Sequence, residues 1–207
     1  MKELGNVFIL GDSYSTFENC IPAKYCNYYS KGNENTYGIS SKKQTWWGLL
    51  LQKTRSNLVI NDSYSGSTVC YTGYSGVDAE KTSFLHRLNV YIENDYFKKI
   101  KLDTLLIFGA TNDSWANVPL GDFGSEDFYS FLPALKRLIE TAKSSLKNVR
   151  IIFIINTELK PEIQDAIIEE CVTDEIQYIL LKNIQKINGH PNKTGMEQIA
   201  VQIYEEL

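Results

Sequence analysis

The nine residues VFILGDSYS, Val7 to Ser15, combine an apolar strand with a polar end. The apolar run from Val7 to Leu10 predicts a buried strand. Gly11 then allows the backbone to turn sharply without a Cβ clash, and Ser13 follows at the carboxyl end of the strand. Because ligands bind at that edge of open α/β sheets, Ser13 is a candidate nucleophile.

Apolar runs alternate with segments of helical spacing along the 207 residues, a pattern that predicts β-α units, a parallel sheet and an α/β fold. The predicted strands cover residues 7–10, 58–60, 104–108, 149–155 and 176–180. The predicted helices cover residues 45–53, 83–99, 125–146, 162–171 and 191–206. Pro161 and Pro191 suit first-turn helix positions. Since no linker or shift of composition divides the chain, we expect one catalytic domain over residues 1–207.

Composition excludes several function classes. With a net charge of −4, the chain lacks the clustered lysines and arginines that a nucleic-acid partner requires. Its apolar runs are too short to span a bilayer, and its amino terminus lacks a signal-peptide pattern, so we expect a cytoplasmic protein. The cysteines have no metal-ligand spacing, and we expect free thiols and no metal site. They are Cys20, Cys26, Cys70 and Cys171.

Two irregular segments are expected to form the walls of a substrate pocket. Residues 17–43 are rich in Tyr, Asn, Ser and Gly, and residues 115–124 follow the third predicted strand. Long loops inside a compact domain are usually functional or mobile. Both segments would lie over the sheet edge that carries Ser13.

The tetrapeptide Asp-Ser-Tyr-Ser occurs twice, at residues 12–15 and at residues 62–65, each time after an apolar strand. Only the first copy is preceded by a glycine, Gly11. We therefore assign the nucleophile to Ser13 and interpret Ser63 as a turn residue. The alternative is that both copies are serine-rich turns without chemistry.

Three further residues are candidates for the same site. Gly66 follows the second copy of the repeat, and its backbone N–H is a candidate donor to an oxyanion. Asn112 follows the third strand and could donate its amide N–H to the same oxyanion, although Asn-Asp after a strand is also ordinary turn chemistry. His190 lies in a turn before the last helix and is the candidate general base. His86 lies in a helical stretch and is interpreted as a surface or packing residue.

These blocks resemble those of the SGNH hydrolases, also called the GDSL esterase/lipase superfamily. The family is named for a serine, a glycine, an asparagine and a histidine in four separated blocks. The chain offers them in that order as Ser13 in GDSYS, Gly66 in NDSYSGST, Asn112 in GATND and His190 in GHPN. The resemblance implies a three-layer α/β/α, flavodoxin-like fold with a five-stranded parallel sheet and no cofactor.

The resemblance also implies the hydrolysis of an ester through an acyl-serine intermediate. Ser13 would attack the ester carbonyl, and His190 would remove its proton and later protonate the leaving alcohol. The oxyanion would be held by the backbone N–H groups of Ser13 and Gly66 and by the side chain of Asn112.

One catalytic position departs from the family pattern. Members commonly carry an aspartate three residues before the histidine, where this chain has Ile187. The imidazole would then be oriented by Asn188, by Gln185 or by a backbone carbonyl, which leaves a Ser-His dyad assisted by a neutral acceptor. Asp12 and Asp113 adjoin candidate residues but are interpreted as structural.

The tryptophans and tyrosines could stack on a carbohydrate, although aromatic residues also fill cores and pocket walls in most domains. The first hypothesis for the substrate is a small acyl ester, with an acetyl group on a carbohydrate as the leading example. One alternative is a lysophospholipase- or thioesterase-like hydrolase. Another is a non-catalytic ligand-binding module on the same fold, because fold does not fix function.

Overall fold

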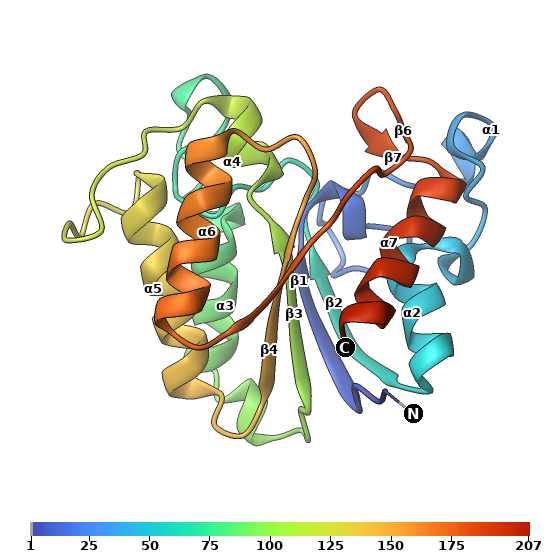
Figure 1. Cartoon of the computed structure of the whole chain (residues 1–207), viewed down its shortest axis with the longest axis horizontal. Helices are drawn as coiled ribbons and strands as arrows, with labels where there is room; N and C mark the ends of the chain where they lie inside the picture. The colour runs from blue at the N-terminus through green and yellow to red at the C-terminus, as the bar shows by residue number, and fades with distance from the viewer. Residues whose placement is uncertain (1) are drawn as a thin grey trace.

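A computed structural model describes residues 2–207 and contains a parallel five-stranded sheet between two layers of helices (Figure 1). Across the sheet the strands follow the order β2-β1-β3-β4-β5, and each neighbouring pair is parallel. The strands are β1 Asn6–Gly11, β2 Asn57–Ser63, β3 Thr104–Gly109, β4 Arg150–Ile155 and β5 Gln177–Leu180. The predicted three-layer α/β fold is confirmed, and the five predicted strands occur within a few residues of their predicted bounds.

The longer helices cover the two faces of the sheet. Figure 1 shows α3, α5 and α6 on one face and α2 and α7 on the other. Their bounds are α2 Trp46–Thr54, α3 Phe84–Glu93, α5 Phe131–Ser145, α6 Pro161–Thr173 and α7 Lys193–Glu206. Two short helices, α1 Glu34–Tyr37 and α4 Thr111–Ala116, lie in the connections that follow β1 and β3.

Each face of the sheet has its own hydrophobic core. In β1, Phe8 and Leu10 join the core beneath α3, α5 and α6, whereas Val7 and Ile9 join the core beneath α2 and α7. All four side chains are fully buried. Burial of such a side chain contributes on the order of 2 kcal/mol, so both alternating sets stabilise the strand. This two-sided burial explains the continuous apolar runs of the sequence.

The last helix begins later than predicted. It starts at Lys193 because Asn192 is its N-cap and accepts a hydrogen bond from the Gly195 N–H at 3.0 Å. Pro191 therefore does not occupy a first-turn position. It belongs instead to β7, His190–Pro191, which pairs antiparallel with β6, Lys186–Ile187.

Two other predicted helices are shorter than expected. The helix predicted from residue 125 begins at Phe131, and the helix predicted to reach residue 99 ends at Glu93. Pro161 does occupy the first turn of α6, as predicted. The irregular segment from residue 17 to 43 contains only α1 and short 3₁₀ turns, so it is largely the long loop that the sequence predicts.

All four cysteines are free thiols. Among residues 2–207, no three His, Cys, Asp or Glu side chains gather in a way that could hold a metal ion. The helices over the same residues are all too short or too polar to span a membrane.

Candidate active site

The carboxyl ends of β1, β2 and β3 carry the residues that the sequence singles out. In Figure 1 this edge lies at the top of the sheet, below α4 and near the β6–β7 hairpin. Ser13 follows β1, Gly66 follows β2, and Asn112 lies in the first turn of α4 after β3. His190 reaches the same edge from β7. Segments far apart in the sequence thus meet at one place.

Ser13 begins a 3₁₀ turn, Ser13–Ser15, directly after β1. Asp12 caps this turn, because its Oδ1 accepts a hydrogen bond from the Tyr14 N–H at 2.9 Å. A Cβ on Gly11 would lie 2.5 Å from Ser63 Oγ. The same Cβ would lie 2.7 Å from the Cβ of Ser15, at the end of the turn itself. A glycine is therefore required both by the turn, as the sequence predicts, and by the close approach of the end of β2.

His190 lies on a tight hairpin opposite Ser13. The two residues between β6 and β7, Asn188 and Gly189, both have positive φ, 48° and 78°, as a two-residue hairpin turn requires. This turn places His190 Nε2 2.9 Å from Ser13 Oγ. Nδ1 lies 3.3 Å from the carbonyl oxygen of Asn188. Because a carbonyl can only accept, Nδ1 carries the proton and Nε2 is free to accept the Ser13 hydroxyl proton.

Within the described part of the chain, no carboxylate forms a hydrogen bond or ion pair with His190. Of the three orienting groups that the sequence left open, the structure selects a backbone carbonyl, that of Asn188. Ile187, at the position of the common family aspartate, is half-buried against the α2/α7 core.

Both irregular segments contribute an aromatic ring to the surroundings of the imidazole. Tyr28, from the loop after β1, stacks on His190 with ring centroids 3.6 Å apart and an interplanar angle of 8°. Trp115, from α4, meets His190 edge-on with centroids 5.8 Å apart. The prediction that these segments lie over the sheet edge near Ser13 is confirmed.

Two tyrosine hydroxyls fix the hairpin that carries His190. Tyr14 donates to the Gly189 carbonyl oxygen, and Tyr29 donates to the Pro191 carbonyl oxygen at 2.7 Å. Tyr14 directly follows Ser13, and Gly189 directly precedes His190. The Tyr14 hydrogen bond therefore joins the turn that carries Ser13 to the hairpin that carries His190.

Burial lowers the pKa of His190 below its usual value of 6.5. The Asn188 carbonyl acts against this effect, while the nearby Lys186 ammonium lowers the pKa further. Lys186 is itself held by Thr157 Oγ1 at 2.6 Å and Glu158 Oε2 at 3.1 Å. The imidazole is therefore neutral at pH 7 and able to accept a proton.

Three N–H groups at this edge of the sheet have a proton without an acceptor among the described residues. In the described residues, neither the backbone N–H of Ser13 nor that of Gly66 donates a hydrogen bond. Gly66 has a φ of 84°, and a Cβ there would meet no atom within 4 Å, so the space on the Cβ side of the residue is open. Asn112 Nδ2 donates one proton to the Ser67 carbonyl oxygen at 2.9 Å, which leaves its second proton unused.

Two buried carboxyl groups adjoin these residues. Burial raises the pKa of Asp12 to about 7, against the lowering effect of the Tyr14 N–H. Burial also raises the pKa of Asp113 to about 6, while bonds from the Val69 and Cys70 N–H groups lower it. Asp113 thereby ties α4 to the loop after β2, and Asp12 caps the Ser13 turn, in agreement with the structural roles expected of both.

The second copy of the repeat is engaged in packing. The Ser63 hydroxyl donates to Asn61 Oδ1 at 2.5 Å and is fully buried. Asp62 forms a buried ion pair with Arg87 of α3, with 2.7 Å between Oδ2 and Nη1. Arg87 also donates to the Gly11 carbonyl oxygen at 3.0 Å, so it joins the ends of β1 and β2.

Sequence reasoning missed Arg87, although a signal was present. Phe84 and Leu88 mark the buried face of α3, and a residue three positions after Phe84 lies on that same face. His86 is partly exposed and lies 4.0 Å from Glu80, as expected of a surface residue.

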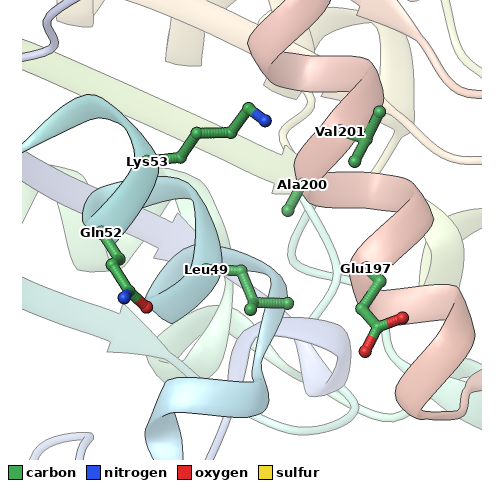
Figure 2. Close-up of a pocket in the computed structure, with 6 residues that line it drawn as sticks. All are labelled: Leu49, Gln52, Lys53, Glu197, Ala200 and Val201. Atoms are coloured by element: carbon green, nitrogen blue, oxygen red, sulfur yellow. The ribbon is translucent and has the colours of Figure 1, made fainter.

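A separate groove lies between α2 and α7, and none of the candidate site residues lines it. Figure 2 shows side chains from both helices around it. They are Leu49, Gln52, Lys53, Glu197, Ala200 and Val201.

Comparison with known proteins places this geometry in a family. A family model described as GDSL-like lipase/acylhydrolase matches residues 5–207. A GDSL-like lipase from Bacteroides ovatus is 37% identical, with a TM-score of 0.89 over 99% of this chain and 98% of the other. A second, from Bacteroides uniformis, is also 37% identical, with a TM-score of 0.88 over 98% of this chain and 95% of the other.

A more distant structure shares the fold. It is a family two carbohydrate esterase from Clostridium thermocellum in complex with cellohexaose, 15% identical, with a TM-score of 0.65 over 100% of this chain and 64% of the other. The comparison with curated proteins gives no significant match. The family model and the two Bacteroides structures agree along almost the whole sequence, and the chain belongs to the GDSL-like lipase/acylhydrolase family.

Proposed function

We propose that the protein is a serine esterase that hydrolyses a small acyl ester through an acyl-Ser13 intermediate, with His190 as general base. The observation that carries the proposal is the 2.9 Å separation between Ser13 Oγ and His190 Nε2. Membership in the GDSL-like lipase/acylhydrolase family makes the chain a hydrolase of ester bonds. Because the candidate residues span positions 13 to 190, the proposal treats the whole chain as one catalytic domain.

In the proposed reaction, Ser13 Oγ attacks the ester carbonyl carbon while its proton moves to His190 Nε2. The imidazolium then protonates the leaving alcohol, and the C–O bond of the ester breaks to give the acyl-enzyme and the free alcohol. Water, deprotonated by His190, attacks the acyl carbon and releases the acid and the Ser13 hydroxyl. The Asn188 carbonyl accepts from Nδ1–H throughout, so a neutral acceptor does the work of the usual carboxylate.

The negative charge that develops on the carbonyl oxygen makes the transition state unfavourable. Three hydrogen-bond donors are proposed to stabilise this charge. They are the unused N–H groups of Ser13 and Gly66 and the second Nδ2 proton of Asn112. Removal of one donor of this kind costs about 3 kcal/mol at the transition state, or roughly a hundredfold in kcat.

Two observations support a small acyl group on a carbohydrate as the substrate. Ser13, Asn112 and His190 are only 2%, 3% and 9% exposed, so the reacting groups offer a small accessible surface, which suits a small acyl group. Tyr74 and Trp115 are 42% and 38% exposed beside Asn112 and His190, and exposed aromatic faces suit a sugar ring. The fold shared with a carbohydrate esterase is in keeping with this choice.

The proposal is tested with p-nitrophenyl esters of increasing acyl length and with acetylated oligosaccharides. We expect kcat/KM to fall from acetate to longer esters. Ser13→Ala should abolish turnover, and its matched control Ser63→Ala should keep most of it, because Ser63 has no histidine partner. A fluorophosphonate probe should label Ser13. Labelling at Ser63 would refute the assignment, and a lack of turnover with every ester would favour a binding module.

A further inference from the structure

We propose that Tyr74 is a positioning residue that orients the Asn112 amide toward the reacting carbonyl oxygen. The inference rests on the proposed function, because it requires Asn112 to be an oxyanion donor. It assigns a role to a tyrosine that lies outside the four family blocks, in the loop between β2 and α3.

The contacts of Asn112 define which way its amide points. The Tyr74 hydroxyl donates to Asn112 Oδ1 at 2.7 Å, and Asn112 Nδ2 donates to the Ser67 carbonyl oxygen at 2.9 Å. An amide side chain has one acceptor oxygen and two N–H protons. These two contacts occupy the oxygen and one proton, so a single proton is left for a substrate.

The opposite orientation of the amide is unfavourable. A flip would bring Asn112 Oδ1 against the Ser67 carbonyl oxygen, so that two acceptors would face each other without a proton between them. The Tyr74 hydroxyl adds the second constraint, because it gives Oδ1 its hydrogen-bond donor. Without that hydroxyl, Oδ1 would be left buried without a partner, and the amide would turn to find another donor.

The position of Tyr74 is better explained by this bond than by packing. Its side chain is 42% exposed, so burial of the ring contributes little to stability. The loop around it closes on itself through a hydrogen bond from the Gly73 N–H to the Val77 carbonyl oxygen at 2.8 Å. Burial, Asp12 and Asp113 raise the pKa of the phenol, so the hydroxyl keeps its proton at neutral pH. Since that proton goes to Asn112, Tyr74 itself cannot also donate to the oxyanion.

A double-mutant cycle tests the inference with p-nitrophenyl acetate. The proteins are wild type, Tyr74→Phe, Asn112→Ala and the double variant, with Tyr178→Phe as a matched exposed-tyrosine control on β5. Phenylalanine keeps the ring and removes only the hydroxyl. We expect Tyr74→Phe to lower kcat about three- to tenfold, the effect of one hydrogen bond, with KM changed less than about twofold. Asn112→Ala should lower kcat about a hundredfold.

The decisive quantity is the effect of Tyr74→Phe in the Asn112→Ala background. If Tyr74 acts only through the amide, the double variant should match Asn112→Ala within about twofold. An undiminished three- to tenfold loss in that background would mean that Tyr74 acts independently and would overturn the inference. An unchanged kcat in Tyr74→Phe, together with a large loss in Asn112→Ala, would also overturn the inference. That result would leave the proposed function intact. An unchanged kcat in Asn112→Ala would refute the oxyanion role and this inference together.

Discussion

Replacing Ile187 with aspartate tests whether the imidazole of His190 works without a carboxylate. The β6–β7 pairing sets Ile187 directly opposite His190, so the two side chains share one face of the hairpin with Cβ atoms about 5 Å apart. The introduced carboxylate would reach the region of Nδ1, where the Asn188 carbonyl is now the acceptor. It would favour the imidazolium form and raise the pKa of His190.

The size of the shift follows from the separation and the exposure. Two unit charges about 5 Å apart attract by about 3 kcal/mol at an effective dielectric constant of about 20, or roughly two pKa units. Ile187 is only half-buried, so solvent reduces this attraction, and we expect a rise of about one unit. In the wild type, burial places the pKa of His190 below 6.5, so activity should persist at mildly acid pH. In Ile187→Asp, the acid limb should move to higher pH.

The assay is the pH dependence of kcat/KM, which reports the pKa values of the free enzyme. Ile187→Asn is the control, because it removes the same apolar contacts without adding a charge. Thermal melting of both variants measures the cost of a polar group at a half-buried site. A folded Ile187→Asp protein whose acid limb stays in place would refute the reasoning. An equal shift in Ile187→Asn would assign the change to lost packing.

Two other substitutions test how the site is held. Arg87→Met should lower the free energy of unfolding by about 3–5 kcal/mol, because it leaves the Asp62 carboxylate buried without its partner. Urea denaturation measures this loss of stability, and a loss below about 1 kcal/mol would contradict the prediction. Gly189→Ala should lower kcat about tenfold, because φ is 78° there and the new Cβ would lie 2.9 Å from the Trp115 ring, which displaces the His190 hairpin. Steady-state kinetics measures this effect, and an unchanged kcat would show that the hairpin tolerates the strain.

The sheet could be predicted from the sequence because its strands are buried on both faces. Continuous apolar runs such as the one from Ile151 to Ile155 have no competing interpretation once their length and flanking residues are considered. The layers then follow from the alternation of strands and helices. Of the site residues, Ser13 and His190 could be predicted because each belongs to a short block with a distinctive composition. In the structure, their side chains lie within hydrogen-bond distance of each other.

The surroundings of His190 could not be predicted in the same way. Pro191 was interpreted as the first residue of a helix, although Asn188-Gly189 before it is a typical two-residue hairpin turn. The sequence thus contains both a helix-start signal at Pro191 and a hairpin-turn signal just before it. In the structure, α7 begins after Asn192 because Asn192 is its N-cap. Tyr28 gave no signal at all, because its loop has no periodicity and its contact with the imidazole is made entirely by tertiary structure.

The two copies of Asp-Ser-Tyr-Ser follow strands that occupy different places in the sheet. The chain leaves β1 for β2 on one side and then crosses to β3 on the other, so the connections diverge above β1. Ser13 lies at that divergence, with α4 on its β3 side, whereas Ser63 ends the edge strand β2. The two copies also pack against each other, since Gly11, the residue before the first copy, leaves the space that Ser63 Oγ fills. Gly11→Ala should therefore push the ends of β1 and β2 apart and disturb Ser13 without touching a reacting group, and activity should fall together with the melting temperature.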